Sequence, residues 1–118
     1  ERIQILKDRS AELGRPRDAV EIAPQFSMLL ANTDEEAEAA YMASGLVAHR
    51  RSLAYTGRDL SHQVKANLVG SPATVIEKVE KLKSIGVDHC SALMIPANSI
   101  AEMNEQIEWF ARDVMTKF

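Results

Sequence analysis

Residues 70–95 read GSPATVIEKVEKLKSIGVDHCSALMI, and this stretch decides the fold class. Ser71 is a good helix N-cap, and Pro72 takes the first helical position, where its missing amide costs nothing. The amphipathic helix that they open ends at Gly86, and an apolar run over residues 90–95 follows with the length of a buried strand. A helix that leads into a buried strand in this way is typical of a parallel α/β fold.

The same order of features occurs earlier in the chain. Apolar residues at helical spacing predict a helix over residues 2–13, which a glycine and a proline end, and an alternating apolar pattern then predicts a strand over residues 20–31. Thr33 and Glu36 form a capping box, because each side chain can bond the backbone amide of the other. This box opens a helix predicted over residues 34–55.

The second half of the chain completes the pattern. A helix is predicted over residues 72–85, a strand over 88–95, and a final helix, opened by a capping box at Ser99 and Glu102, over 99–116. Sequential strands joined through helices usually pair in parallel, so we expect the two predicted strands to be parallel neighbours. Such a chain suits a closed barrel or an open doubly wound sheet, and periodicity alone does not decide between them.

Two places interrupt the regular pattern. Pro24 cannot donate a ladder hydrogen bond, so the fully paired part of the first strand is expected to start after it. Residues 58–70 are the least regular stretch, in which Leu60, Val64 and Leu68 at four-residue spacing suggest a short extra helix. The sequence therefore predicts two strands and no third.

Composition argues against several classes of partner. The 118 residues are 46% hydrophobic and 26% charged, which is ordinary for a globular domain, and the net charge of −3 argues against nucleic acid or an anionic membrane. No apolar run approaches the roughly 18 residues of a spanning helix, and residues 1–3 do not open a signal peptide, so a cytoplasmic protein is expected. Cys90 has no second cysteine to pair with, no companions for a metal site, and is expected to be buried.

The candidate pocket follows from position, because the sequence has no short motif that identifies a reaction by itself. In parallel α/β folds, ligands bind beyond the carboxyl ends of the strands. This places Asn32 after the first strand, and Pro96, Ala97 and Asn98 after the second, as candidate lining residues. No catalytic, cofactor-binding or metal-binding residue is identified.

Basic side chains give a second, weaker set of candidates. Arg58 and His62, in the irregular stretch, could reach over the carboxyl ends of the strands to an anionic group on a ligand. Arg50, with its neighbours in sequence, is better explained as positive charge that complements the carboxyl end of a helix dipole. His89 lies close to the start of the second strand, at the end of the fold that serves stability rather than catalysis.

Four segments occur in order along the chain: LANTDEEA at 30–37, NLVGSPATVIEK at 67–78, IGVDH at 85–89 and EWFARDVM at 108–115. In order and spacing they resemble the C-terminal part of the luciferase-like flavin-dependent monooxygenases. That family has a T-D-E-E-A helix start, a G-[ST]-P helix start, a helix that ends in A-G-V-D, and a final helix with an F-A-R-E-V-like end. The conjunction of the motifs carries the resemblance, which covers nearly the whole chain.

The resemblance implies a (β/α)8 barrel of the TIM type that uses flavin mononucleotide (FMN), or a deazaflavin in some branches, to oxidise or reduce a small organic substrate. Such a barrel takes about 250 residues or more, so residues 1–118 would form a single partial domain with its last two β/α units. In the family the flavin is held largely by preceding strands and loops. We therefore expect that residues 1–118 alone bind no flavin and have no enzymatic activity.

Two other functions remain open on the sequence. One is a self-associating α/β interaction module without catalysis, and the other is a fragment of a TIM-barrel enzyme that uses no flavin. A partial barrel has unpaired strand edges, which recruit other chains. Its inward side chains, such as Phe26, Met28, Leu30, Leu93 and Ile95, would also lack their usual neighbours. A homo-oligomer is therefore expected.

Overall fold

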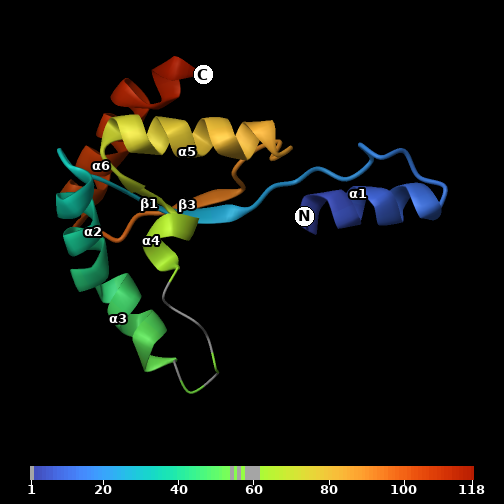
Figure 1. The fold of residues 1–118 in the computed structure, drawn as a ribbon. Helices are drawn as coiled ribbons and strands as arrows, with labels where there is room; N and C mark the ends of the chain where they lie inside the picture. The colour runs from blue at the N-terminus through green and yellow to red at the C-terminus, as the bar shows by residue number, and fades with distance from the viewer. Residues whose placement is uncertain (1, 54, 56, 58–61) are drawn as a thin grey trace.

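A computed structural model describes residues 2–53, 55, 57 and 62–118 of the chain. Its centre is a parallel sheet of three strands, drawn in Figure 1. The strands are β1 (Gln25–Leu30), β2 (Leu68–Gly70) and β3 (Ala92–Met94), in the spatial order β2-β1-β3. β1 is therefore the central strand, and it pairs with a different neighbour along each half of its length.

The register of these pairs shows how β1 is shared. Its amino half pairs with β3, where Phe26 lies opposite Leu93. Its carboxyl half pairs with β2, where Met28 lies opposite Leu68. The edge of β1 on the β3 side therefore has no strand beside Leu30.

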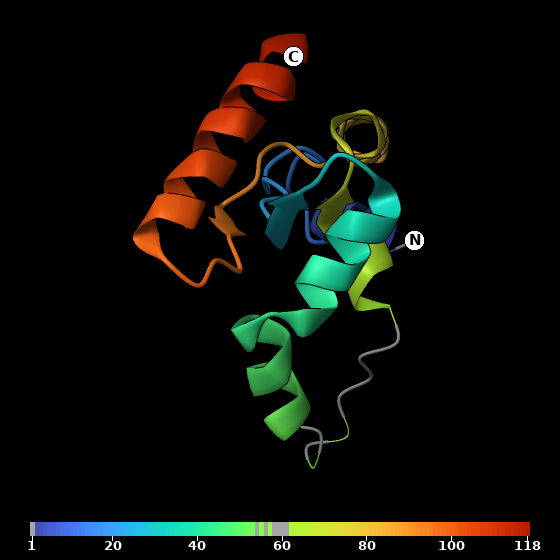
Figure 2. The same ribbon diagram turned by 90° about the vertical axis from the view of Figure 1, so that its left-hand side faces the viewer.

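Helices cover both faces of the sheet, as Figure 2 shows. On one face lie α2, α3 and α4, and on the other α5 and α6, with α1 extending away from the sheet. The bounds are α1 (Arg2–Glu12), α2 (Asp34–Ala43), α3 (Gly45–Ser52), α4 (Gln63–Ala66), α5 (Pro72–Ser84), α6 (Ile100–Asp113) and a 3-10 helix, η2 (Met115–Lys117).

Two hydrophobic cores result, one on each face of β1. The core under α5 and α6 is built on Met28, Leu30, Leu68, Val75 and Val114. The core under α2 and α3 is built on Leu29, Ala37, Tyr41, Val47 and Val69. Adjacent residues of β1 point to opposite faces, so the apolar run at its end is buried on both sides.

The predicted fold class is confirmed. The chain is an α/β protein with a parallel sheet and flanking helices, consistent with a fragment of a TIM-type barrel. The two predicted strands are parallel neighbours, as β1 and β3.

The strand order differs from that of a complete barrel. In a complete barrel consecutive strands lie side by side, which would put β3 against β2. In this chain β3 lies on the other edge of β1, and the outer edge of β2 has no strand beside it.

A lysine covers that outer edge of β2. The ammonium of Lys78, on α5, donates to the backbone carbonyls of Val64, Asn67 and Val69 at 3.1, 3.0 and 2.8 Å. Partial burial of the Lys78 ammonium lowers its pKa, although Asp34 and Glu38 act in the opposite direction. A helix side chain thus satisfies carbonyls that another strand would otherwise satisfy.

The helix predicted over residues 34–55 is wrong as a single element. It breaks at Ser44, whose backbone is extended and whose hydroxyl accepts from the amide of Val47 at 3.3 Å. Ser44 therefore ends α2 and caps α3. Serine favours the N-cap position, and the glycine that follows it weakens the helix, so the Ser44-Gly45 pair is the signal for the break.

The strand predictions were too long and one short strand was missed. β1 starts at Gln25, directly after Pro24 as expected, and residues 20–24 are not a strand. The strand predicted over 88–95 is regular only in β3. β2 lies in the stretch expected to be irregular, where the suggested short helix is α4, and three residues are too few to show a period of two.

Candidate functional site

A hollow of about 270 Å³ lies at the carboxyl ends of β1 and β3, where a parallel α/β fold binds its ligands. We call it the carboxyl-end hollow. β1, α2, the loop after β3, and α6 all contribute to its wall. Its lining consists of Leu29, Leu30, Ala31, Ala40, Pro96, Ala97, Asn98, Glu102, Glu105 and Gln106.

Three of the residues predicted to line the pocket meet in this hollow. Pro96, Ala97 and Asn98 belong to its wall, and Asn32 lies exposed one residue beyond the lining residue Ala31. Among the described residues, the side-chain amides of Asn32 and Asn98 have no hydrogen-bond partner. Each therefore has free donors and an acceptor for a polar ligand group.

The two basic candidates are placed differently. His62 is the N-cap residue of α4, which leads into the amino end of β2, so it lies toward the opposite end of the sheet. It is not among the residues that line the carboxyl-end hollow. Arg58 lies outside the described residues. Of the predicted candidates, Pro96, Ala97 and Asn98 therefore line the hollow.

Gln106 closes one side of the hollow and was not predicted as a site residue. Its side-chain Oε1 accepts from the amide of Leu30 at 2.7 Å, and its Nε2 donates to the carbonyl of Leu30 at 3.0 Å. The contact between Gln106 and Leu30 joins residues that are distant in sequence, so no local sequence pattern predicts it. It fixes the orientation of α6 against the end of β1.

The loop after β3 is held by the predicted capping box, with one change. The hydroxyl of Ser99 accepts from the amide of Glu102 at 3.1 Å, as expected. The carboxylate of Glu102 instead accepts from the amide of Asn98, at 2.7 Å. This bond holds the backbone of Asn98 against the first turn of α6.

Asp34 occupies the amino end of α5, which is another potential anion site at this edge of the sheet. Its carboxylate accepts from the amide of Ser71 at 2.7 Å and from the hydroxyl of Thr74 at 2.8 Å. These hydrogen bonds, first that of the Ser71 backbone, lower the pKa of Asp34 below its ordinary value. The protein's own carboxylate thus takes the place that a phosphate could occupy at a helix amino end.

Gly70 allows the Asp34 carboxylate to lie close to the amino end of α5. Its φ of 154° lies in a region that other residues rarely adopt. A Cβ at this position would lie 2.9 Å from the Thr74 methyl carbon and 3.0 Å from an Asp34 carboxylate oxygen. The glycine of the Gly-Ser-Pro motif therefore serves the Asp34 contact.

The residues that line the carboxyl-end hollow do not fit the phosphate group of FMN. The carboxyl-end hollow is lined by Glu102 and Glu105, and no basic residue lines it. Its volume is below the roughly 300–1,000 Å³ of small-molecule sites. Among the described residues, no group of three or more His, Cys, Asp or Glu could hold a metal ion. The hollow can supply an apolar wall with amide groups, but no charge to hold a phosphate.

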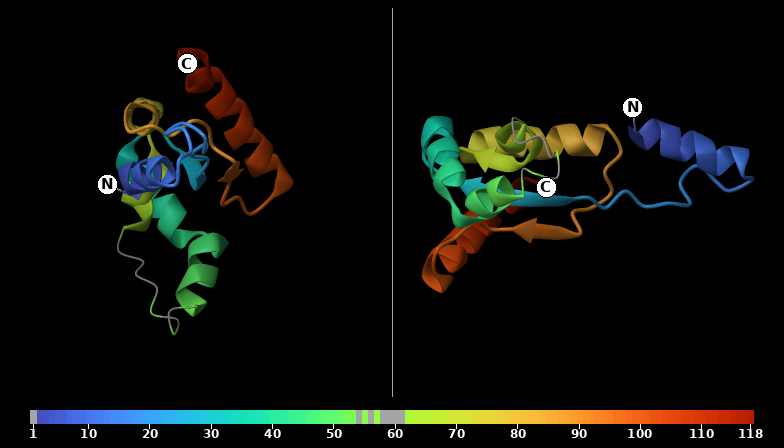
Figure 3. Two further views of the ribbon diagram at one scale, coloured as in Figure 1. Left: turned by 90° about the vertical axis from the view of Figure 1, so that its right-hand side faces the viewer. Right: turned by 90° about the horizontal axis from the view of Figure 1, so that it is seen from below.

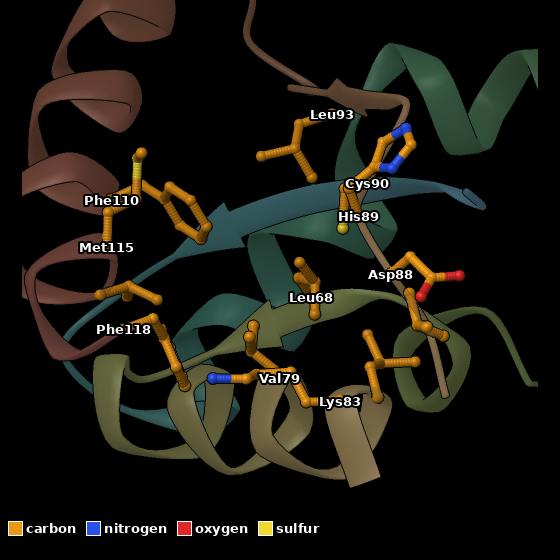
Figure 4. A pocket seen from close by; sticks show the side chains of 13 residues that line it. Leu68, Val79, Lys83, Asp88, His89, Cys90, Leu93, Phe110, Met115 and Phe118 are labelled. Carbon is orange, nitrogen blue, oxygen red and sulfur yellow. The ribbon is translucent and has the colours of Figure 1, made fainter. Parts of the chain in front are cut away.

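Another hollow, of about 530 Å³, lies between α5 and α6 near the amino end of β3 (Figure 4). Its wall is mainly apolar, with Lys83 placed 4.9 Å from the centre of the Phe118 ring. His89 lies at its rim, 3.9 Å from a carboxylate oxygen of Glu21. Cys90, expected to be buried, is exposed there, because the regular part of the strand begins only after it. This hollow is at the end of the sheet opposite to the usual ligand site.

Arg50 forms a polar cluster beneath the sheet rather than acting only at a helix end. Its guanidinium donates to the Tyr41 hydroxyl at 2.7 Å, to Gln63 Oε1 at 2.9 Å and to the Ser27 hydroxyl at 3.1 Å. Tyr41 and Ser27 are fully buried. Since these hydrogen bonds link α2, α3, α4 and β1, the cluster has a structural role in aligning them.

None of the helices among the described residues is long and apolar enough to cross a membrane.

Comparison with solved structures shows a similarity in fold. No protein-family model matches the sequence, and no curated protein matches it. The structure resembles the oxygenating constituent of 3,6-diketocamphane monooxygenase from the CAM plasmid of Pseudomonas putida, a type II Baeyer-Villiger monooxygenase solved in complex with FMN. The TM-score is 0.57 at 21% sequence identity, over 98% of this chain and 38% of that chain. The chain thus spans little more than a third of the length of that oxygenase.

Proposed function

We propose that this chain is the C-terminal part of a luciferase-like, flavin-dependent monooxygenase that acts on a small organic substrate. The observation that carries the proposal is the fold similarity to an FMN-bound oxygenase over 98% of the chain. The order of the sequence motifs at 30–37, 67–78, 85–89 and 108–115 agrees with the same family.

The proposal assigns a limited role to this part of the protein. Asp34 fills the amino end of α5, and Glu102 and Glu105 give the carboxyl-end hollow a negative wall, so the flavin phosphate is bound by other parts of the enzyme. Leu29 and Pro96 offer apolar surface. In our proposal, this surface and the Asn98 amide form one side of the substrate pocket.

The reaction proposed is the transfer of one atom of dioxygen to the substrate, while the other atom leaves as water. Reduced flavin supplies the two electrons for this reaction. No residue of this chain is assigned to the chemical step.

The test uses the longer polypeptide that contains this chain, supplied with chemically reduced FMN and a set of small cyclic and linear ketones under 18O-labelled dioxygen. We expect one labelled oxygen atom per product molecule, measured by mass spectrometry. The 118-residue chain alone serves as the control and should give no product. Absence of labelled product from the longer polypeptide with every ketone would reject a ketone monooxygenase, and failure to bind flavin would reject the flavin enzyme itself.

A further inference from the structure

β3 pairs with an edge of β1 that a complete barrel gives to a different strand. In a (β/α)8 barrel each strand lies between the strand before it and the strand after it in the sequence. Here β1 has β2, the next strand in the sequence, on one edge and β3 on the other. The barrel order would instead put a strand that precedes α1 on this second edge, and β3 on the outer edge of β2.

α1 has the position of a crossover helix that leads into β1, as α5 leads into β3. Residues 13–24, which are neither helix nor strand, join it to β1. In Figure 1 α1 extends away from the sheet, and Ser10 is its one buried residue. A strand before α1 would pair with β1 across this helix, since sequential strands usually do so. It would need the edge of β1 that β3 fills in this chain.

The helices lie on the faces that this strand order requires. The crossover from β1 to β2 moves one way along the sheet, and the crossover from β2 to β3 moves back the other way. Because such crossovers are right-handed, a reversal of direction puts the second helix on the opposite face. The left panel of Figure 3, which looks along the strands, shows α5 and α6 on one side of the sheet and α2 and α3 on the other. In a barrel all of these helices would lie on the outer face.

Burial explains why the chain on its own adopts the reversed order. Met28, Leu30 and Leu68 point to the face opposite α2, which a barrel turns toward its interior and covers with side chains of its other strands. In this chain α5 and α6 cover that face, and the three side chains are at most 2% exposed. With helices on one face only, they would be exposed to water and lose the free energy of burial. A longer polypeptide that supplies the other strands removes this reason for the reversed order.

The contacts that hold the reversed order are few. β3 pairs with β1 over three residues, none of which is fully buried. The outer edge of β2 is covered by the Lys78 ammonium, which donates to the carbonyls of Asn67 and Val69 at 3.0 and 2.8 Å. Because Lys78 is a side chain on α5 and not a strand, its departure would open this edge without changing the pairing of β1 with β2.

We propose that β3 has two positions: beside β1 when the 118-residue chain is alone, and beside β2 when a longer polypeptide supplies the strand that precedes α1. This inference rests on the proposed function, because it takes the chain to be part of a barrel. The transfer of β3 releases Lys78 from the β2 carbonyls and brings α5 to the face of α2. Asn98 stays at the carboxyl edge of the sheet in both positions, since every strand keeps its direction.

The test is disulfide trapping in a Cys90→Ser background, since Cys90 is the only cysteine. The reporter pair is Gln25→Cys with Ala92→Cys, at register partners of β1 and β3 that are both exposed. In the barrel order β2 separates these strands, so the two Cα atoms would lie about 9–10 Å apart, beyond the roughly 7 Å that a disulfide spans. Leu29→Cys with Val69→Cys is the control pair, because β1 and β2 are neighbours in both orders.

Each pair is oxidised mildly in the 118-residue chain and in the longer polypeptide, and mass spectrometry measures the cross-linked fraction. We expect both pairs to cross-link in the 118-residue chain. In the longer polypeptide the control pair should cross-link to the same extent, and the reporter pair about tenfold less or lower still. Equal cross-linking of the reporter pair in the two proteins would overturn the proposal. So would a reporter pair that stays reduced in the 118-residue chain while the control pair cross-links.

A titration with FMN separates failure of this inference from failure of the proposed function. A longer polypeptide that binds FMN and cross-links the reporter pair rejects the two positions of β3 and leaves the flavin enzyme standing. A folded longer polypeptide that binds no FMN rejects the flavin enzyme, and its cross-links still decide where β3 lies. Ser27→Cys with Met94→Cys, also at register partners of β1 and β3, replaces the reporter pair if circular dichroism shows that the first variant does not fold.

Discussion

The side-chain amide of Gln106 pairs with the backbone of Leu30 as a neighbouring strand would, accepting from its amide at 2.7 Å and donating to its carbonyl at 3.0 Å. β3 pairs only with the amino half of β1, so this edge would otherwise be unpaired at Leu30. Lys78 does the same for the outer edge of β2. Side chains on helices thus take the place of strand neighbours beside Leu30 of β1 and along the outer edge of β2.

Replacing Gln106 with methionine should destabilise the fold by about 1–3 kcal/mol, because it leaves the amide and carbonyl of Leu30 without partners while keeping a side chain of similar size. Urea denaturation followed by circular dichroism measures the change. Asn104→Ala, at an exposed position on the same helix, is the control and should change stability by less than about 0.5 kcal/mol. Equal losses for the two variants would show that Gln106 does not close the edge.

Gly70→Ala should destabilise the fold by more than about 1 kcal/mol, since the new methyl group would collide with Thr74 and Asp34 at a strained φ. Gly45→Ala is the matched control. A Cβ at Gly45 meets nothing within 4 Å, so this variant should be unchanged or up to about 1 kcal/mol more stable. Thermal unfolding of both variants checks the difference, and an unaffected Gly70→Ala would contradict the close contact described at α5.

The hydrogen bonds to Asp34 predict a pH dependence. Because its pKa is lower in the folded chain than the usual value of about 3.9, the stabilisation by Asp34 is present above about pH 4. It is lost as the pH falls through the lower pKa of the folded state. Stability measured from pH 6 downward should therefore fall more steeply in the unchanged chain than in Asp34→Asn.

Glu35→Gln removes a carboxylate from the same first turn of α2 and serves as the control for that pH series. It should keep the steep acid loss of the unchanged chain, because Glu35 does not bond to α5. An Asp34→Asn curve that runs parallel to that of the unchanged chain at every pH would mean that the Ser71 contact is not formed in solution.

In the longer polypeptide, Asn98→Ala should weaken binding of substrate or flavin by roughly tenfold, the effect of losing about one hydrogen bond to a ligand. Glu77→Ala should leave both affinities unchanged, because Glu77 is exposed on α5 away from the carboxyl-end hollow. Isothermal titration with each ligand compares them. If both variants bind like the unchanged protein, the pocket lies elsewhere.

Local chemistry explains which features could be predicted from the sequence. The hydroxyls of Thr33, Ser71 and Ser99 accept from amides three residues away, so these N-caps are visible in a short window of sequence, and all three N-cap bonds form as expected. The same holds for α1, α5 and α6, whose bounds agree with the predictions within a few residues. The placement of Pro96 and Asn98 in a hollow followed from the general position of ligands in parallel folds.

Features that depend on distant contacts were not predictable. β2 is a strand because Leu68 and Val69 pair with β1, not because three residues carry a pattern of their own. The contacts of Asp34 with Ser71, and of Gln106 with Leu30, join residues 37 and 76 positions apart. The position of β3 beside β1 also depends on which strand edges are already paired, and the pairing of strand edges is a property of the whole fold.

The central claim is that this chain is part of a flavin-dependent barrel whose cofactor is held mainly by other residues. The most direct test is a titration of FMN, followed by the quenching of its fluorescence, into the longer polypeptide and into the 118-residue chain. The account predicts one FMN bound per longer polypeptide and no measurable binding by the 118-residue chain. Binding of one FMN per molecule by a monomer of the 118-residue chain would contradict it, as would a folded longer polypeptide that binds no FMN.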